Sequence, residues 1–315
     1  GEIRDRLAWV YDTSVTIGDT TLTTPVNTAP LIKGSIYGGG ENGHVYHNSW
    51  VHVNGGTIGV SSGDDVTVTN ADNTTTTYKP YNYPYRGNVY GGGCGTDKYY
   101  VGSVPDGHTA NDGEGTKYNP LSGIVQGNAK VIVDGGHVVH NVYGAGAMGS
   151  VGTITNFDNL DDKDASNNYL YKHAAATNDG KESYYDFGLS WPYQFTYSGT
   201  GQATVDIAGG AEIGVNQIDA TGGHVFGAAR GGVEVGESNL ANHRYEEAKL
   251  ANVRTTQVTI GTATGDTQPT IRGSVYGGGE DGHVYENTSV TINKGSIAHS
   301  VFGGGKGTST FKVAE

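Results

Sequence analysis

Acidic residues and histidines with the make-up of an acid–base or metal site occur twice in the chain, each time directly after a glycine triplet. Glu41-Asn42-Gly43-His44 is the first copy, and Glu280-Asp281-Gly282-His283 is the second. A glutamate near a histidine can exchange protons, and histidines stacked along a repeat can share a metal ion. An active site is normally present once, whereas structural residues recur with a repeat. We therefore expect turns here, with each histidine beginning a short strand, and metal binding is the alternative.

A glycine-rich segment, Gly144-Ala145-Gly146-Ala147-Met148-Gly149, matches the fingerprint of dinucleotide-binding loops. That fingerprint binds a pyrophosphate only where a strand leads into it and a helix follows it. No helical pattern follows here, and the segment is one copy of a recurring corner. We therefore exclude a dinucleotide site.

Clustered aspartates provide a candidate calcium site at Asp158, Asp161, Asp162 and Asp164. Oxygen ligands on a loop suit Ca²⁺, but the spacing lacks the glycine and the final glutamate of an EF-hand loop. A solvated loop is the expectation, with Ca²⁺ as the alternative, and we expect no other metal or cofactor.

Catalytic residues are not evident. Polysaccharide-cleaving enzymes place paired acids beside the bond that is broken. Asp64-Asp65 and Asp161-Asp162 lie instead in segments that interrupt the repeat described below. Cys94 is the only cysteine and occupies a variable position of that repeat, so it forms no internal disulfide and no cysteine-based metal site. We expect that the protein is not an enzyme.

A short corner motif recurs along the chain and controls how the rest of the sequence is interpreted. Each copy is a β-branched residue and an aromatic residue, followed by small residues that are mostly glycine. The interval between copies varies, from the short step between Val275 and Val301 to the long one between Val142 and Val225. The copies begin at Ile36, Val89, Val142, Val225, Val275 and Val301.

A second motif, V-x-I or a close variant, alternates strictly with the first. Its distance from the corners is fixed where no extra residues intervene, since Val51 follows Ile36 at the same interval as Val290 follows Val275. The shortest complete unit therefore spans the interval from Val275 to Val301. It consists of two short strands that are joined by glycine turns. Additional residues are expected at two corners of the unit. The copies begin at Val15, Val51, Val131, Val205, Val258 and Val290.

A unit this short cannot bury its own apolar face, but stacked units cover one another. The chain has 31 Val and 15 Ile against 9 Leu, a bias that favours strands over helices. A six-bladed propeller would need four strands in every blade, for which the interval from Val275 to Val301 is too short. The predicted fold class is all-β: a parallel β-solenoid, or β-helix, of about six coils with loop and hairpin insertions at its corners.

The domain organisation follows from the repeat. Residues 1–14 are expected to cover or stack on one end, and residues 15–315 to form a single solenoid domain. Insertions are expected near 60–86, 95–127, 148–203 and 232–257, with one short helix at 240–250. The third insertion carries aromatic candidates for ligand or lateral contacts, which are Tyr184, Tyr185, Trp191, Tyr193 and Tyr197.

The glycine corners are assigned a structural role, because glycine allows positive φ and close backbone approach. They comprise Gly38, Gly39, Gly40, Gly91, Gly92, Gly93, Gly277, Gly278, Gly279, Gly303, Gly304 and Gly305. The preceding aromatics form a column of Tyr37, Tyr90, Tyr143, Phe226, Tyr276 and Phe302. If the valines point inward, this column points outward or lies beneath an insertion. We expect it to stabilise the stack, and sugar binding is the alternative.

Charge and hydropathy limit the partners. The net charge is −13 and the 19 Lys and Arg residues are scattered, which argues against nucleic acid. No apolar run approaches the roughly 20 residues that a membrane-spanning helix needs.

Units of the form Val51-His52-Val53-Asn54-Gly55-Gly56-Thr57-Ile58, leading to Asn88-Val89-Tyr90-Gly91-Gly92-Gly93, resemble the VYGGG/VFGGG repeats of very large, adhesin-like surface proteins of gut-type Bacteroidota. The resemblance covers about half of the chain and none of the insertions. It implies a parallel β-helix, an extracellular or cell-surface location, and an adhesive or fibrous role.

We therefore expect a structural and interaction protein, an extracellular β-solenoid that forms or belongs to a surface fibre. An uncapped stack exposes unpaired backbone groups, so its ends are expected to meet other copies head to tail or to continue in a longer repeat chain. The alternative is a carbohydrate-binding or polysaccharide-processing parallel β-helix with glycan partners.

Overall fold

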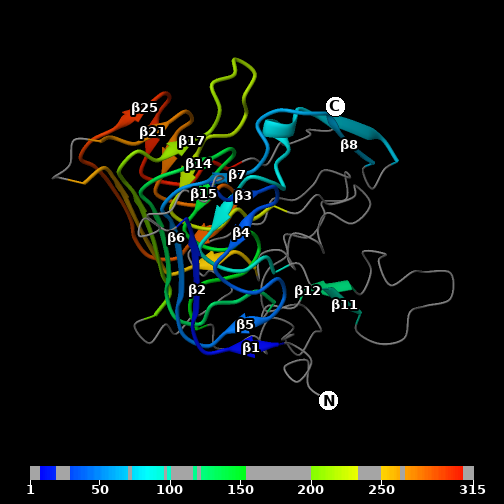
Figure 1. Ribbon diagram of the computed structural model, residues 1–315. Coiled ribbons are helices and arrows are strands. Elements are labelled where there is room, and N and C mark those ends of the chain that lie inside the picture. Colours follow the sequence, from blue (N-terminus) through cyan, green and yellow to red (C-terminus); the bar gives the residue numbers. More distant parts are fainter. Residues whose placement is uncertain are drawn as a thin grey trace, which may run out of the picture.

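The computed structural model describes residues 8–18, 29–69, 73–95, 98–100, 116–118, 122–153, 200–232, 250–262 and 267–307. Within these ranges the protein is nearly all-β and contains no α-helix. Three parallel sheets of six strands each run along the molecule, which confirms a parallel β-solenoid of six coils (Figure 1).

The V-x-I motifs form sheet 1, in which the six motif valines lie opposite one another in the order of the chain. Alternate residues point inward, so that Ala129, Val131 and Val133 are buried while Lys130 and Ile132 are half-buried. Sheet 1 consists of β2 (Thr13–Ile17), β6 (Ser49–Val53), β13 (Ala129–Val133), β16 (Gln202–Ile207), β20 (Thr255–Ile260) and β24 (Thr288–Ile292).

Two-residue strands form the other two six-stranded sheets. Sheet 2 consists of β3 (Leu31–Ile32), β7 (Thr57–Ile58), β14 (His137–Val138), β17 (Glu212–Ile213), β21 (Thr270–Ile271) and β25 (Ser296–Ile297). Sheet 3 contains the corner motifs and consists of β4 (Ile36–Tyr37), β10 (Val89–Tyr90), β15 (Val142–Tyr143), β18 (Val225–Phe226), β22 (Val275–Tyr276) and β26 (Val301–Phe302).

A fourth line of parallel pairing, which we call ladder 4, lies between sheet 3 and sheet 1 in the order of the chain. It begins with β1 (Trp9–Val10) on β5 (His44–Val45) and ends with β19 (Asn252–Val253) on β23 (His283–Val284). Single bridges from Val45 to Val125, Val125 to Val151 and Val151 to Val253 join the two pairs. Residues 9 and 10 therefore take part in the parallel pairing of the stack.

The core is a continuous stack of mainly β-branched side chains from the three sheets. Interior members such as Val51, Val131, Val205 and Val258 are 0–1% exposed. Valines of ladder 4 form a second buried cluster with the alanines of neighbouring corners. Each coil buries its apolar residues against the coils above and below it, which is how so short a repeating unit obtains a core.

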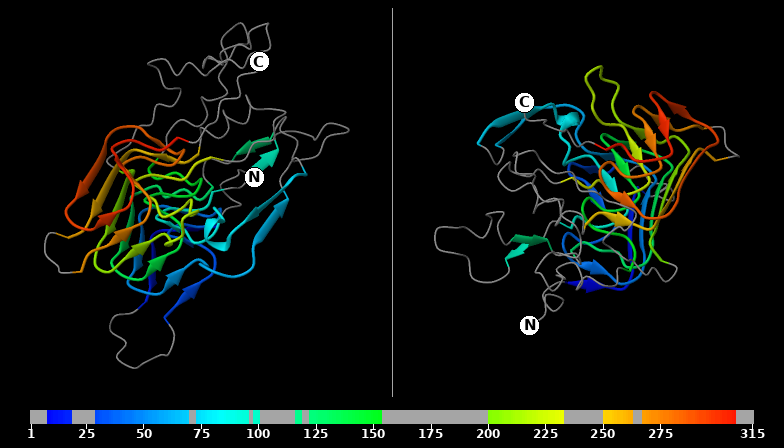
Figure 2. Two further views of the ribbon diagram at one scale, coloured as in Figure 1. Left: turned by 90° about the horizontal axis from the view of Figure 1, so that it is seen from above. Right: turned by 180° about the vertical axis from the view of Figure 1, so that it is seen from behind.

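The insertions leave the stack at its corners. The first contains the antiparallel hairpin β8 (Val66–Thr69) and β9 (Thr75–Tyr78), followed by the 3₁₀ turn η2 (Pro80–Asn82), and the hairpin projects from the side of the stack (Figure 2). The second contains the antiparallel strands β11 (Lys98–Tyr100) and β12 (Thr116–Tyr118). Extra residues also separate β2 from β3, and the third insertion follows Val151 of ladder 4, so insertions occur at all four corners of the coil rather than two. The helix expected at 240–250 lies outside the described residues except for Leu250, which is not helical.

Candidate functional site

At every corner except the last, the first glycine packs directly against the backbone of the next coil. A β-carbon at Gly91 would collide with the carbonyl oxygen of Gly144, and one at Gly144 would collide with that of Gly227. None of the predicted corner glycines has a positive φ, so the expectation of left-handed backbone at these positions is wrong. Close approach between coils is the reason for glycine here.

The aromatic residues of sheet 3 stack in one continuous column. Successive ring centroids are 4.8–4.9 Å apart and nearly parallel, with interplanar angles of 7–11°. Tyr90, Tyr143 and Phe226 are at most 1% exposed and form a buried cluster separate from the valine core. Phe302 at the last coil is 45% exposed. The column is therefore covered along its middle and open at its C-terminal end.

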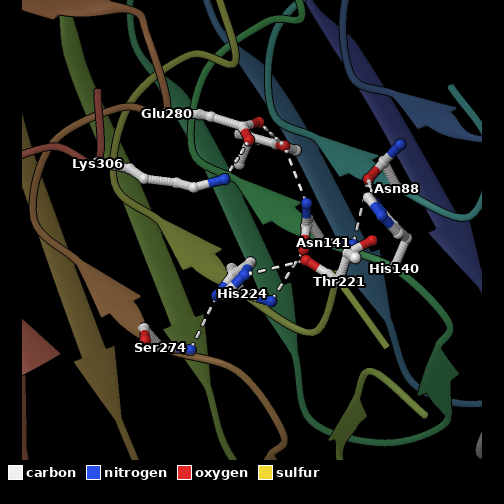
Figure 3. Close-up of polar contacts among 9 residues, drawn as sticks. Asn88, His140, Asn141, Thr221, His224, Ser274, Glu280 and Lys306 are labelled. Atoms are coloured by element: carbon white, nitrogen blue, oxygen red, sulfur yellow. Dashed lines mark hydrogen bonds and ion pairs between the residues drawn. The ribbon is translucent and has the colours of Figure 1, made fainter. Parts of the chain in front are cut away.

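Polar side chains just before sheet 3 form a second column, which we call the polar ladder (Figure 3). Each side chain accepts a hydrogen bond from the backbone N–H of its counterpart in the next coil. Asn88 Oδ1 accepts from Asn141, and Asn141 Oδ1 accepts from His224, at 3.1 and 2.8 Å. Ser35 Oγ, His224 Nδ1 and Ser274 Oγ do the same for Asn88, Ser274 and Ser300. The polar ladder thus extends the backbone pairing beyond the two-residue strands.

The hydrogen bonds define the tautomers of two histidines. His140 Nδ1 lies 2.9 Å from Asn88 Oδ1, which can only accept, so Nδ1 carries the proton. His224 Nδ1 accepts from Ser274, so its proton is on Nε2, which donates to the Thr221 carbonyl at 3.2 Å. Burial lowers the pKa of His140 to about 4 and also lowers the pKa of His224. Both imidazoles are therefore neutral at pH 7.

A cluster of charged groups lies beside the aromatic column. Tyr143 Oη donates to Glu280 Oε2 at 2.6 Å, and Lys306 Nζ donates to Glu280 Oε1 at 2.9 Å. Burial raises the pKa of Glu280, but these two hydrogen bonds and the positive charges of Lys306 and Arg230 outweigh it and hold the pKa below its usual value. Burial and the nearby carboxylate raise the pKa of Tyr143 well above 10. Glu280 is therefore ionised and accepts from a neutral phenol.

The residue after each corner triplet determines this charge pattern. Successive coils place Glu41, Cys94, Ala147, Arg230, Glu280 and Lys306 there. The sign alternates over the last three coils, from Arg230 to Glu280 to Lys306. Cys94, a free thiol of intermediate exposure, is one member of this corner column.

A polar cleft of about 410 Å³ lies between the first insertion and the charged cluster. Tyr81 Oη and Asn82 Nδ2 donate to the side chain and the carbonyl of Asp219, and the Thr221 N–H donates to Asn82 Oδ1, all at 2.8–2.9 Å. These bonds hold the insertion of the second coil against a loop of the fourth. The cleft is lined by Thr77, Tyr78, Lys79, Asn82, Pro84, His140, Asn141, Asp219, Thr221, Glu280 and Lys306.

The two ends of the stack expose groups that interior coils bury. Val301 is 46% exposed, whereas Val275 beside it is 0% exposed. A β-carbon at Gly303 would have no described atom within 4 Å, in contrast to every interior counterpart. At the other end Trp9, Val10 and Leu31 are exposed. Both edges are therefore open to another strand, as far as the described residues show.

The two histidines that were weighed as metal ligands lie in ladder 4. His44 begins β5, and His283 begins β23. Among the described residues no group of three or more His, Cys, Asp or Glu side chains is arranged to hold a metal ion. The aromatic candidates between Tyr184 and Tyr197 and the aspartates between Asp158 and Asp164 lie outside the described residues. No described helix is long and apolar enough to cross a membrane.

The sequence does not predict the cleft. Its contacts join residues about 138 positions apart, such as Tyr81 and Asp219, and the loop from Val215 to Gly223 carries no motif. The charged cluster had a visible signal, since Glu280 and Lys306 hold the same repeat position one coil apart.

Comparison of the chain with protein-family models, curated proteins and solved structures returned no match.

Proposed function

We propose that the protein is a structural and interaction protein, an extracellular β-solenoid that forms, or is part of, a surface fibre. The observation that supports this most directly is the open edge of the last coil. Val301 and Phe302 are 46% and 45% exposed, while Val225 and Phe226 in the interior are 0% exposed. Open edges of parallel strands recruit further strands unless they are covered.

The lateral surface fits a scaffold role. Insertions leave the coils without disturbing the register of the three sheets, because paired motif residues stay opposite one another on either side of each insertion. A fold of this kind can carry variable loops on a constant axis.

Sedimentation velocity over a wide range of protein concentration, followed by negative-stain electron microscopy, tests the proposal. Elongated particles that lengthen with concentration are expected. Discrete particles of one chain at every concentration would contradict it.

A second candidate function is glycan binding in the polar cleft. The volume of the cleft, about 410 Å³, falls within the ~300–1,000 Å³ that is typical of small-molecule sites. Amide, carboxylate, ammonium and phenol groups line it together with Tyr78, a set able to bond sugar hydroxyls and pack on a sugar ring. A glycan array tests this candidate, with Asn82→Ala as the matched variant. Binding that is unchanged in the variant, or no binding at all, would count against it.

A further inference from the structure

The first and last coils carry the same strand sequence at opposite ends of the molecule. The strand β2 reads Thr13-Ser14-Val15-Thr16-Ile17, and β24 reads Thr288-Ser289-Val290-Thr291-Ile292. Each strand has one paired edge, since β2 pairs with β6 and β24 pairs with β20. The remaining edges face away from the stack in opposite directions. Identical strand sequences therefore lie on the two free edges of sheet 1.

We infer that the last coil of one molecule receives the first coil of a second copy, in parallel and in the register of the interior coils. The inference rests on the end-to-end assembly proposed above and specifies its partner and register. Val290 would lie opposite Val15 and Ile292 opposite Ile17, as Val258 lies opposite Val290 within the chain. The other lines of pairing continue in the same way, with Val284 on Val10, Ile297 on Ile32 and Phe302 on Tyr37.

The backbone donors and acceptors of the two ends are complementary. Inside the stack, the N–H groups of Val275 and Gly277 donate to carbonyls of the following coil, Ser300 and Phe302. Val301 and Gly303 hold these donor positions on the last coil. Ser35 and Tyr37 hold the acceptor positions on the first coil, because Asn88 and Tyr90 accept from Ile36 and Gly38 in the next pair. The same register brings Ser300 Oγ to the Ser35 N–H of the copy, which continues the polar ladder.

The corner glycines provide the space that this contact requires. At Gly277, a β-carbon would collide with the carbonyl oxygen of Gly303. Gly303 has the same place on the last coil but no described neighbour on its outer side. Gly38 of a second copy would occupy that space. No contact among the described residues requires glycine at position 303, whereas a following coil would require it.

The charges at the corners also match. Lys306 on the last coil pairs with Glu280 of the coil before it, at 2.9 Å. The corresponding residue of the first coil is Glu41, which is exposed. Stacking would place Glu41 of the copy on the other side of Lys306 and extend the alternation of sign along the corner column. A lysine between two carboxylates favours this partner over one with a basic or neutral corner residue.

Cysteine trapping tests the register. The side chains of Ser14 and Ser289 are exposed on the outer face of sheet 1. In the inferred register they lie directly opposite one another, at a strand spacing of ~4.8 Å that suits a disulfide. In a Cys94→Ser background, Ser14→Cys protein mixed with Ser289→Cys protein should give a cross-linked pair under mild oxidation. Thr16→Cys with Ser289→Cys, which is out of register along the strand, is the matched control and should cross-link at least tenfold less.

Gly303→Ala tests the interface by a different route. The added methyl group has room in the single molecule but would block the incoming coil. The variant should keep the melting temperature of the dilute protein and lose assembly in sedimentation. Gln257→Ala, on the outer face of an interior coil, should change neither.

The outcomes separate the two proposals. Particles that lengthen with concentration but cross-link equally in both pairings, or assemble normally with Gly303→Ala, would overturn the register while leaving the fibre proposal intact. Monomeric protein at every concentration would overturn both.

Discussion

The phenol of Tyr143, in the third coil, donates a 2.6 Å hydrogen bond to the carboxylate of Glu280, which follows the fifth. The fourth coil places Phe226 between them in the column, and this residue has no hydroxyl to offer the carboxylate. The contact therefore links coils that are not neighbours in the stack. Most other described contacts join adjacent coils, so this bond couples the stability of the middle of the molecule to that of its C-terminal end.

Tyr143→Phe should lower the free energy of unfolding by about 1–3 kcal/mol, because it removes one of the two hydrogen bonds that stabilise a largely buried carboxylate. Stacking of the ring should be unaffected. Urea denaturation monitored by circular dichroism measures the change. Tyr46→Phe, at an exposed tyrosine, is the control and should shift stability by less than about 0.5 kcal/mol. Equal effects in the two variants would show that the Glu280 contact contributes nothing.

His140 should make the protein less stable in acid. Burial lowers its pKa from 6.5 to about 4 in the folded protein, so the unfolded chain binds the proton more tightly. Stability is then lost as the pH falls from about 6.5 towards 4, by up to about 3 kcal/mol once both states are protonated. His140→Asn keeps an amide beside Asn88 and removes the titration, and its stability should fall less over that range. Gln257→Asn, at an exposed site that does not titrate, should reproduce the wild-type pH dependence.

Glu280 should affect the stability of the protein at a lower pH than His140 does. Its pKa is held below the ordinary value of 4.5, so its contribution to stability is present above that value and is lost as the pH falls through the lower, folded pKa. Glu280→Gln should therefore be less stable than wild type at pH 7, with a difference that shrinks below about pH 4. A constant difference across the titration would contradict the ion pair with Lys306.

The corner glycines should differ sharply in their tolerance of alanine. Gly91→Ala forces a methyl group into the carbonyl of Gly144 and should cost about 3 kcal/mol. Gly303→Ala meets no described atom and should change the stability of the dilute protein by less than about 1 kcal/mol. Thermal melts of the two variants at low concentration provide the comparison. Similar losses would mean that glycine is needed at these corners for a reason other than the approach of the next coil.

Hydrogen exchange at one backbone amide, that of Thr221, should report whether the first insertion is attached to the fourth coil. The Thr221 N–H donates to Asn82 Oδ1 at 2.9 Å, and this bond is made only while the insertion lies against the fourth coil. Asn82→Ala should raise the exchange rate of that amide several-fold without changing the exchange of Val205 or Val258 in sheet 1. Unchanged exchange at Thr221 would indicate that the loop is ordered independently of the insertion.

The architecture was predictable because the two motifs alternate strictly along the chain and keep a fixed distance wherever no insertion separates them. The valines of the V-x-I motifs and the corner valines all lie in the predicted correspondence. Ladder 4 was only partly predictable, because two of its coils contribute a single bridged residue, Val125 and Val151, with no motif around it. The cleft depends on contacts between an insertion and a distant loop, and neither carries a periodic signal. The reason for glycine at the corners required the neighbouring backbone, which no single repeat contains.

The last interval between corners, from Val275 to Val301, is the shortest in the chain, so the insertions are confined to the earlier coils. In an assembly of stacked copies, each side decoration would then recur once per molecule, at an axial period of ~29 Å for six coils at ~4.8 Å each. A surface that is weakly attractive on one molecule would be presented many times along one rigid line. Contacts too weak to hold a single copy would add up by avidity, and the spacing between them would be set by the number of coils in the chain.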